Sequence, residues 1–297
     1  MAEAILAKKS TLCVGLDPAL EQIPPALVRK YRRRVATLDG TQAVALCFEE
    51  FCRGIVDAVA DVAVAVKPQA AFFEQYGGAG WSALRGVIEY AREHELIVIL
   101  DAKRGDIAST AMAYARAVFD GAPGFDGDVL GLNADAVTLN PYLGADSLQP
   151  FLDYCQRGKG AFILARTSNP GARDLQDMEI DGRPFFLNVA DLIERVGRSY
   201  VGEHGYSDVG AVVGATAPEA LSALRAALPR SFFLVPGMGA QGGAVENLTG
   251  IADGAGLGFI ASASRSIIYA WQKTGDDYRS AAAQAAKELR ERLVGVR

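Results

Sequence analysis

The sequence predicts an α/β protein that folds as a single-domain, closed (β/α)₈ barrel, a TIM barrel, over residues 1–297. Three observations favour this fold class. The chain contains eight short apolar or β-branched runs that each stop near a Gly, Pro or polar residue. Segments with helical spacing of apolar residues separate most of these runs, which is typical of a parallel sheet. Eight repeats in a chain of 297 residues favour a closed barrel over an open sheet.

The eight runs predict the strands of the barrel in chain order. We expect them at residues 11–16, 62–66, 97–100, 136–139, 161–165, 209–213, 232–235 and 258–261. Polar residues or glycine follow each run, among them Asp17, Lys67, Asp101, Asn140 and Arg265. Because barrel enzymes carry their active sites at the carboxyl ends of the strands, this pattern predicts a site at that end.

The segments between the strands predict helices and one small hairpin. We expect helices within 81–95, 188–204 and 266–294. Residues 21–60 are long for one crossover, and their basic run at 29–34 is typical of an exposed helix face, with an anion-binding patch as the alternative. Asp181-Gly182 predicts a hairpin turn within residues 169–184. No Ser-rich or Pro-rich linker divides the chain, which favours one domain.

Composition excludes several classes of function. The net charge of −5 argues against a nucleic-acid-binding protein, whose phosphate contacts need clustered Lys and Arg. Four cysteines and two histidines show no metal-ligand spacing, so we expect reduced thiols and no metal site. We find no signal peptide and no run of about 18 apolar residues. The sequence therefore predicts a cytoplasmic protein with no membrane partner.

Residues 101–106, Asp-Ala-Lys-Arg-Gly-Asp, place charge at the end of an expected core strand. Asp101 and Lys103 are two residues apart, so on a strand their side chains point to the same face, with Asp106 just beyond. Burying an ion costs several kcal/mol unless an opposite charge pairs with it. The cluster therefore indicates chemistry, and a structural ion pair at a strand-to-helix turn is the alternative.

The loops after the last two strands indicate a phosphate site. Residues 236–243 are rich in glycine, and residues 262–266 contain Ser264 and Arg265 immediately before a helix. Glycines allow backbone N–H groups to approach phosphate oxygens closely, and a guanidinium can bind two oxygens at once. In barrels these two loops bind phosphate more often than the others do. The spacing of the glycines does not match a dinucleotide-binding fingerprint.

In these residues the chain resembles the orotidine 5′-phosphate decarboxylase family, and specifically its bacterial branch with the motif Asp-Ala-Lys-Arg-Gly-Asp-Ile at 101–107. The matching segments run almost from end to end, at 13–18, 66–69, 101–110, 138–142, 166–171, 236–243 and 263–267. The resemblance implies decarboxylation of the small-molecule nucleotide orotidine 5′-monophosphate to UMP and CO₂, the last step of de novo UMP synthesis. It also implies that neither a metal nor an organic cofactor takes part.

The resemblance assigns four catalytic residues. Lys103 lies beside the carbanion that forms at ring carbon C6 and then protonates it, and Asp101 lies near the departing carboxylate. Lys67 and Asp106 complete an alternating array of two lysines and two aspartates, which keeps each lysine charged. Lys67 also matches a position that contacts ribose hydroxyls.

The resemblance assigns the substrate-binding residues as well. Asp17 matches a ribose contact, and Ser168 matches a residue that hydrogen-bonds the pyrimidine. Gln241 and Arg265 match the phosphate clamp, and Ser264 precedes Arg265 in the same loop. As alternatives, Asp17 caps the turn that follows it, and Ser168 serves only turn formation.

The same resemblance implies a homodimer with shared active sites. Asp106, Ile107 and Thr110 match residues that reach into the site of the partner subunit. We therefore expect the active sites to lie at the interface between two copies of the chain.

Three rival functions remain. Sugar-phosphate decarboxylases and synthases that use Mg²⁺ share the Asp-x-Lys-x-x-Asp strand, but they place an acidic ligand where this chain has Lys67, which would repel the metal. A Schiff-base aldolase needs a neutral amine, whereas the neighbouring aspartates favour a charged lysine. The third is a phosphate-binding scaffold without activity. The presence of all four charged residues of the array argues against it, namely Lys67, Asp101, Lys103 and Asp106.

Overall fold

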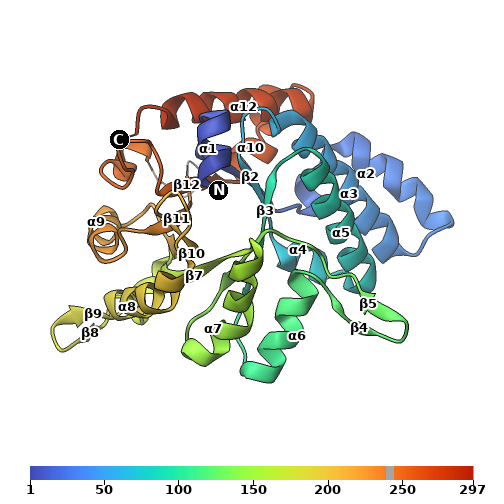
Figure 1. Cartoon of the computed structure of the whole chain (residues 1–297). Helices are drawn as coiled ribbons and strands as arrows, with labels where there is room; N and C mark the ends of the chain where they lie inside the picture. The colour runs from blue at the N-terminus through green and yellow to red at the C-terminus, as the bar shows by residue number, and fades with distance from the viewer. Residues whose placement is uncertain (239–243, 297) are drawn as a thin grey trace.

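The computed structural model describes residues 1–238 and 244–296, and its eight central strands form a closed parallel barrel (Figure 1). Around the barrel the strands follow the order β1-β12-β11-β10-β7-β6-β3-β2. Their bounds are Leu12–Leu16 for β1, Ala65–Pro68 for β2, Ile97–Arg104 for β3, Ala136–Leu139 for β6, Gly160–Arg166 for β7, Ser207–Val213 for β10, Ser231–Pro236 for β11 and Phe259–Ala263 for β12. The predicted barrel is thus confirmed, because all eight expected runs overlap these strands.

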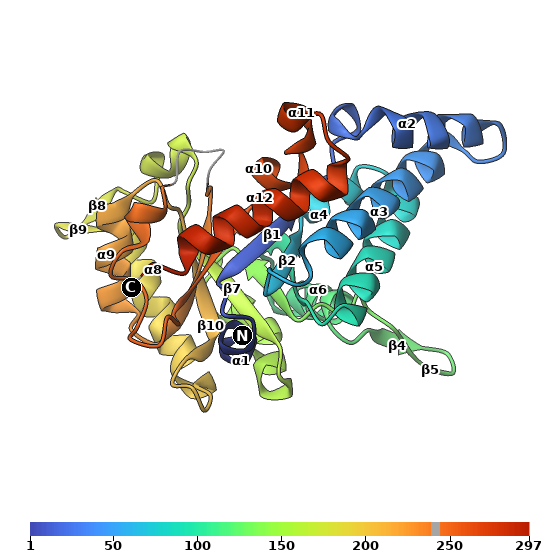
Figure 2. The same ribbon diagram turned by 90° about the horizontal axis from the view of Figure 1, so that it is seen from above.

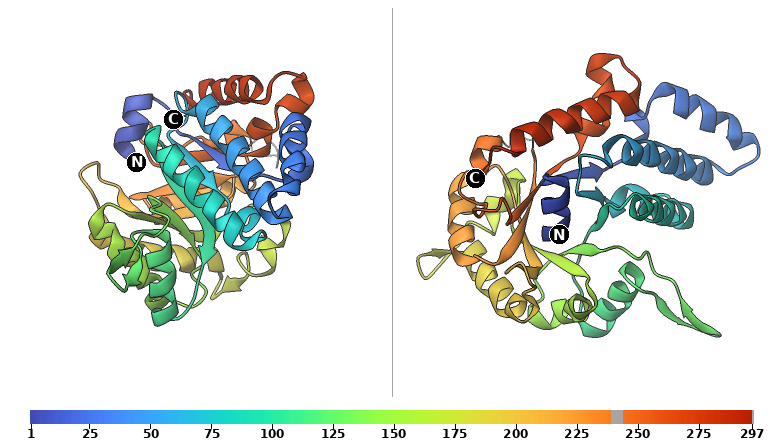
Figure 3. Two further views of the ribbon diagram at one scale, coloured as in Figure 1. Left: turned by 90° about the vertical axis from the view of Figure 1, so that its right-hand side faces the viewer. Right: turned by 45° about the horizontal axis from the view of Figure 1, so that its top comes forward.

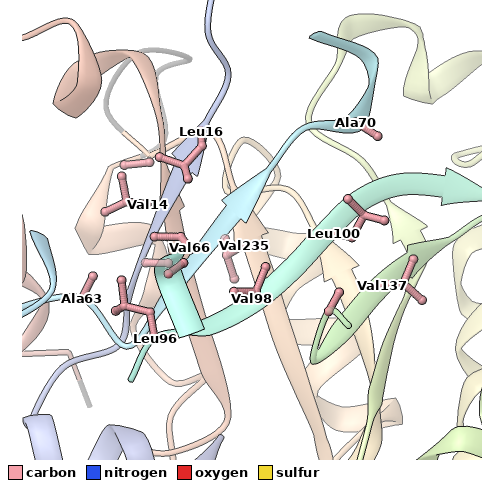
Figure 4. Packing of buried hydrophobic residues seen from close by; sticks show 14 of the residues in the cluster. Val14, Leu16, Ala63, Val66, Ala70, Leu96, Val98, Leu100, Val137 and Val235 are labelled. Carbon is pink, nitrogen blue, oxygen red and sulfur yellow. The ribbon is translucent and has the colours of Figure 1, made fainter. Parts of the chain in front are cut away.

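Alternation along the strands produces two apolar layers. Residues that point outward, such as Val14, Val66 and Val98, pack in the layer between barrel and helices (Figure 4). The residues next to them in sequence, such as Cys13 and Ile99, belong to a second cluster that fills the barrel. The first helix, α1, contributes to this inner cluster and lies against the ring of strands in Figure 3.

Helices surround the barrel on its outside, as Figure 1 shows. The α-helices are α1 (Ala2–Lys8), α2 (Pro25–Arg32), α3 (Gly40–Val59), α4 (Ala70–Glu74), α5 (Gly77–Glu93), α6 (Ala108–Val118), α7 (Ala145–Leu152), α8 (Phe185–Gly197), α9 (Pro218–Ala227), α10 (Arg265–Ile268), α11 (Trp271–Thr274) and α12 (Tyr278–Leu293). Short 3₁₀ helices are η1 (Leu20–Gln22), η2 (Arg33–Ala36), η3 (Asp153–Arg157), η4 (Pro170–Asp174), η5 (Arg198–Tyr200) and η6 (Val245–Leu248). Within the described residues, none of the helices combines the length and apolar composition needed to cross a bilayer.

Several predicted boundaries were wrong; the helix expected within 188–204, for example, is α8 at Phe185–Gly197. The helix expected over 266–294 is divided into α10, α11 and α12, because Gly275 ends α11 with a left-handed φ of 77° and Asp277 caps α12 by accepting from two backbone N–H groups. Strand β3 continues through the charged residues to Arg104. Strand β2 begins at Ala65 and includes Lys67, which we had expected beyond its end.

Two hairpins extend from the barrel. The predicted one comprises β8 (Glu179–Ile180) and β9 (Arg183–Pro184), joined by Asp181 and Gly182 with φ of 53° and 73°, as a type I′ turn requires. The other, β4 (Ala122–Gly124) with β5 (Gly127–Val129), was not predicted and projects away from the barrel (Figure 2). In the basic run at 29–34, all four arginines are exposed and Lys30 pairs with Glu50, as expected for an exposed helix face.

Candidate active site

A polar layer lies above the apolar interior of the barrel, at the carboxyl ends of the strands. Strand alternation places Lys67 two residues after Ala65, and Asp101 two residues after Ile99, so both point inward above the inner cluster. A cavity of about 500 Å³ opens over them, a size typical of small-molecule sites. The predicted site is therefore a physical cavity at the expected end of the barrel.

An array of three charged side chains forms the floor of this cavity. Asp101 accepts from Lys67 Nζ at 2.5 Å through Oδ2 and from Lys103 Nζ at 2.6 Å through Oδ1. The side chains of Lys67 and Asp101 are each 8% exposed, whereas that of Lys103 is 45% exposed. One carboxylate therefore holds two ammonium groups, of which that of Lys103 is the more exposed.

Mutual attraction keeps the array charged in spite of burial. Burial opposes the charge of Lys67, but Asp101 and Asp17 outweigh it and raise the pKa of the Lys67 ammonium above its ordinary value. Burial likewise opposes the charge of Asp101, and the two lysines overcome it and hold the pKa of that carboxyl well below its usual range. A doubly engaged carboxylate between two cations is a poor ligand for a divalent metal.

The wall of the cavity at the ends of β1 and β12 carries polar groups suited to a ribose phosphate. Asp17 and Ser264 line it, and within the described residues Asp17 Oδ1 and Ser264 Oγ are buried without a hydrogen-bond partner. Buried polar atoms normally have partners, so these two are suited to a polar ligand. An added Cβ on Gly15 would lie 2.7 Å from Ser264 Cβ, so glycine is needed at 15 to admit Ser264.

Arg265 and Ser168 also border the cavity. The exposed guanidinium of Arg265 forms no ion pair with the described residues, which leaves its donors available to an anionic ligand. Ser168 follows β7, where Gln176 Oε1 accepts from the backbone N–H of Thr167 at 2.7 Å and fixes the loop. We had not predicted this role of Gln176.

Two further buried hydroxyls were missed by the sequence analysis. Tyr269 Oη donates to the Asp17 carbonyl and accepts from Ala19 N–H, both at 2.8 Å, and so fixes the loop that carries Asp17. Thr138 Oγ1 donates to Asp101 Oδ1 at 2.9 Å. Tyr269 is 252 positions from Asp17, and a contact over that separation leaves no local pattern.

Three predicted site residues, all described, do not line this cavity. Asp106 is half-buried, and its Oδ1 accepts from Ile107 N–H at 2.8 Å. Ile107 is 64% exposed, and Thr110 is exposed on the first turns of α6. Gln241 lies outside the described residues. Among the residues that are described, no group of three or more His, Cys, Asp and Glu side chains could hold a metal ion.

The chain is similar over almost its whole length to proteins of one known family. A model of the orotidine 5′-phosphate decarboxylase / HUMPS family matches residues 10–277. The orotidine 5′-phosphate decarboxylase of Caldicellulosiruptor bescii is 40% identical over 296 residues, covering 99% of this chain and 96% of that protein. Its counterpart from Rhodopirellula baltica is 43% identical over 300 residues, covering 98% and 97%.

Solved structures give the same result. The OMP decarboxylase of Leishmania donovani is 37% identical, with a TM-score of 0.72 over 97% of this chain and 94% of that one. A putative orotidine-monophosphate decarboxylase from Toxoplasma gondii is 31% identical, with a TM-score of 0.78 over 99% and 96%.

Proposed function

This chain belongs to the orotidine 5′-phosphate decarboxylase / HUMPS family and is a decarboxylase of that family, and we propose that it converts orotidine 5′-monophosphate to UMP and CO₂ through a C6 carbanion that Lys103 protonates. The observation that carries this proposal is the array in which buried Asp101 holds the Lys103 ammonium at 2.6 Å, on the floor of the cavity. We further propose that the whole chain acts as one catalytic domain.

The two ends of the cavity suit the two ends of the nucleotide. Its phosphate would bind Arg265 together with Gln241, and Ser264 contributes at the same loop. The ribose hydroxyls would bind Asp17 and Lys67. These two residues lie close enough together for the charge of Asp17 to raise the pKa of Lys67. Ser168 would hydrogen-bond the pyrimidine, which places C6 and its carboxylate above the charged array.

The reaction follows from the charges. As the bond between C6 and the carboxylate breaks, CO₂ leaves and the electron pair remains on C6 as a carbanion. The Lys103 ammonium attracts this developing negative charge and then donates a proton to C6, and the neutral amine regains a proton from water. Asp101 repels the substrate carboxylate, and the repulsion fades as CO₂ departs.

No single contact provides enough stabilisation. One charge pair at about 4 Å contributes about 4 kcal/mol at an effective dielectric near 20. Enzymes lower barriers by roughly 8 to 23 kcal/mol, several times that amount. Binding of the phosphate, distant from C6, would supply part of the remainder by holding the ring against the array.

Decarboxylation in the presence of EDTA tests the proposal. Purified protein is mixed with orotidine 5′-monophosphate and EDTA, and loss of the pyrimidine absorbance is followed. We expect full turnover. Turnover that EDTA abolishes would favour the Mg²⁺-dependent enediolate enzymes, and phosphate binding without turnover would favour an inactive scaffold. Inactivation by borohydride with substrate would favour a Schiff-base aldolase.

We also propose a homodimer in which Asp106, Ile107 and Thr110 complete the site of the partner subunit. Their position on an exposed segment, away from the cavity of their own subunit, supports this. Inactive Asp106→Asn protein mixed with inactive Lys103→Ala protein should regain activity, because one hybrid site then contains both native residues. No recovery in spite of proven subunit exchange would contradict the shared site.

The cellular location follows from the substrate. A nucleotide that carries a phosphate does not cross a membrane unaided, because its charge is too costly to transfer into lipid. We therefore propose that the protein works in the cytoplasm, where such nucleotides are made.

A further inference from the structure

The strand that carries Lys103 is irregular at the reactive residues. Leu100 of β3 pairs with Val137 of β6, but the next pair joins Arg104 to Leu139. Four steps along β3 thus face two steps along β6, and the extra residues form a bulge that contains Lys103. Bulges next to active sites re-aim side chains, and this one turns the lysine toward the cavity.

Lys103 also has an unusual backbone. Its φ is 47°, in the left-handed region that residues with a side chain seldom adopt. Such a conformation persists only where the surroundings hold it in place. The group that holds it lies on the neighbouring strand β6.

The Thr138 hydroxyl is that group. Its oxygen accepts from the backbone N–H of Ala102 at 3.1 Å and of Lys103 at 3.0 Å, and it donates its proton to Asp101 Oδ1 at 2.9 Å. A hydroxyl has one proton and two lone pairs, so these bonds use its whole capacity. Thr138 is 1% exposed. It therefore has nothing left to offer a substrate and acts through its neighbours.

We propose that Thr138 is a positioning residue that fixes the backbone of Lys103 and the carboxylate of Asp101 in one arrangement, and so aims the ammonium at the reacting carbon. The proposal rests on the proposed function, because it presumes that Lys103 delivers the proton. A single hydroxyl thereby connects the backbone and the side chains of the charged array.

Two variants of Thr138 separate the hydroxyl from the shape of the residue. Thr138→Val keeps the shape and removes the hydroxyl, whereas Thr138→Ser keeps the hydroxyl. We expect Thr138→Val to lower kcat about 100-fold, as a displacement of about 1 Å can. Thr138→Ser should restore kcat to within about fivefold of the native value. The affinity for UMP, measured by calorimetry, should change less than about threefold in both, because phosphate and ribose bind elsewhere.

Ser207→Ala is the matched control. Ser207 is also a buried strand hydroxyl, which donates to the Gly197 carbonyl at 2.7 Å and accepts from Val209 N–H at 3.1 Å. It lies at the start of β10, away from the cavity. This variant should lower the unfolding midpoint and leave kcat unchanged. Equal losses of kcat in Thr138→Val and Thr138→Ser, or a native kcat in Thr138→Val, would overturn the proposal.

A crystal structure of Thr138→Val gives a readout that does not depend on activity. We expect the Lys103 backbone to leave the left-handed region and its Nζ to lose the 2.6 Å contact with Asp101. An unchanged φ and contact would overturn the positioning role. If the native protein does not decarboxylate orotidine 5′-monophosphate, the proposed function is contradicted. The crystal structure of Thr138→Val then still tests whether Thr138 positions Lys103.

Discussion

Replacement of Lys67 by methionine tests how strongly the buried ion pair stabilises the protein. Lys67 Nζ lies 2.5 Å from Asp101 Oδ2, and both side chains are 8% exposed. Removing one partner of a buried pair costs about 3 to 5 kcal/mol, because the other charge stays buried. Lys103 and Thr138 still bind Asp101 in the variant. We therefore expect the lower end, a loss of about 3 kcal/mol in the free energy of unfolding.

Lys30→Met is the control for this measurement. Lys30 Nζ lies 2.5 Å from Glu50 Oε2, the same separation, but the two side chains are 53% and 28% exposed. Exposed pairs contribute about 0 to 1 kcal/mol, so this variant should lose less than about 1 kcal/mol. The difference between the two variants isolates the effect of burial.

The pH dependence of the loss has a defined sign. The lowered pKa of Asp101 stabilises the folded protein above the ordinary aspartate value of about 3.9, and this contribution is lost as the pH falls toward the folded pKa. The raised pKa of Lys67 stabilises the folded protein below the ordinary lysine value of about 10.4, and this contribution is lost as the pH rises through the folded pKa. The difference between native protein and Lys67→Met should be largest between about pH 5 and pH 9 and shrink outside that window.

Urea unfolding followed by circular dichroism, at several pH values, measures these losses. If Lys67→Met loses no more stability than Lys30→Met at pH 7, or if its loss does not diminish toward low pH, the reasoning from burial and charge is refuted.

Three further predictions concern the walls of the cavity. Arg265→Ala should raise KM at least about tenfold with a smaller change in kcat, because the lost contact holds the phosphate in ground and transition states alike; an unchanged KM would remove this residue from the clamp. Gly214→Ala would place a Cβ 2.7 Å from the backbone of Ser168 and should lower kcat/KM about tenfold, whereas Gly78→Ala, which meets nothing within 4 Å, should leave it unchanged; equal effects would contradict the packing argument. Tyr269→Phe should cost about 1 kcal/mol in the free energy of unfolding and raise KM, because the loop after β1 loses two hydrogen bonds; a native KM would contradict its positioning role.

Local sequence patterns predicted the barrel and the end of it at which the candidate cavity lies. The strands are short, continuously apolar runs, and the polar residues after them indicated the end that carries the candidate site, so neither prediction needed long-range information. Asp101 and Lys103 were predictable for the same reason. Their spacing of two residues predicted a common face, and both line the cavity, although Lys103 reaches it through the bulge in β3 and not through regular alternation.

The missed features depend on contacts that are distant in sequence. Thr138 acts through a bulge in the neighbouring strand, and Tyr269 binds a loop 250 positions away, so neither leaves a local signal. The β3 boundary was misplaced because a charged run usually marks the end of a strand. Here Asp101 is paired with Lys67 of the adjacent strand, and β3 continues through a bulge to Arg104.

The turnover of Lys103→Ala tests the central claim most directly. The variant is assayed with orotidine 5′-monophosphate in EDTA, after its affinity for UMP has shown that the cavity is intact. The account predicts that kcat falls to the uncatalysed background, because the other described ammonium at Asp101, that of Lys67, is only 8% exposed and is proposed to contact the ribose. Turnover near that of the native protein would contradict the claim that this lysine stabilises and protonates the carbanion.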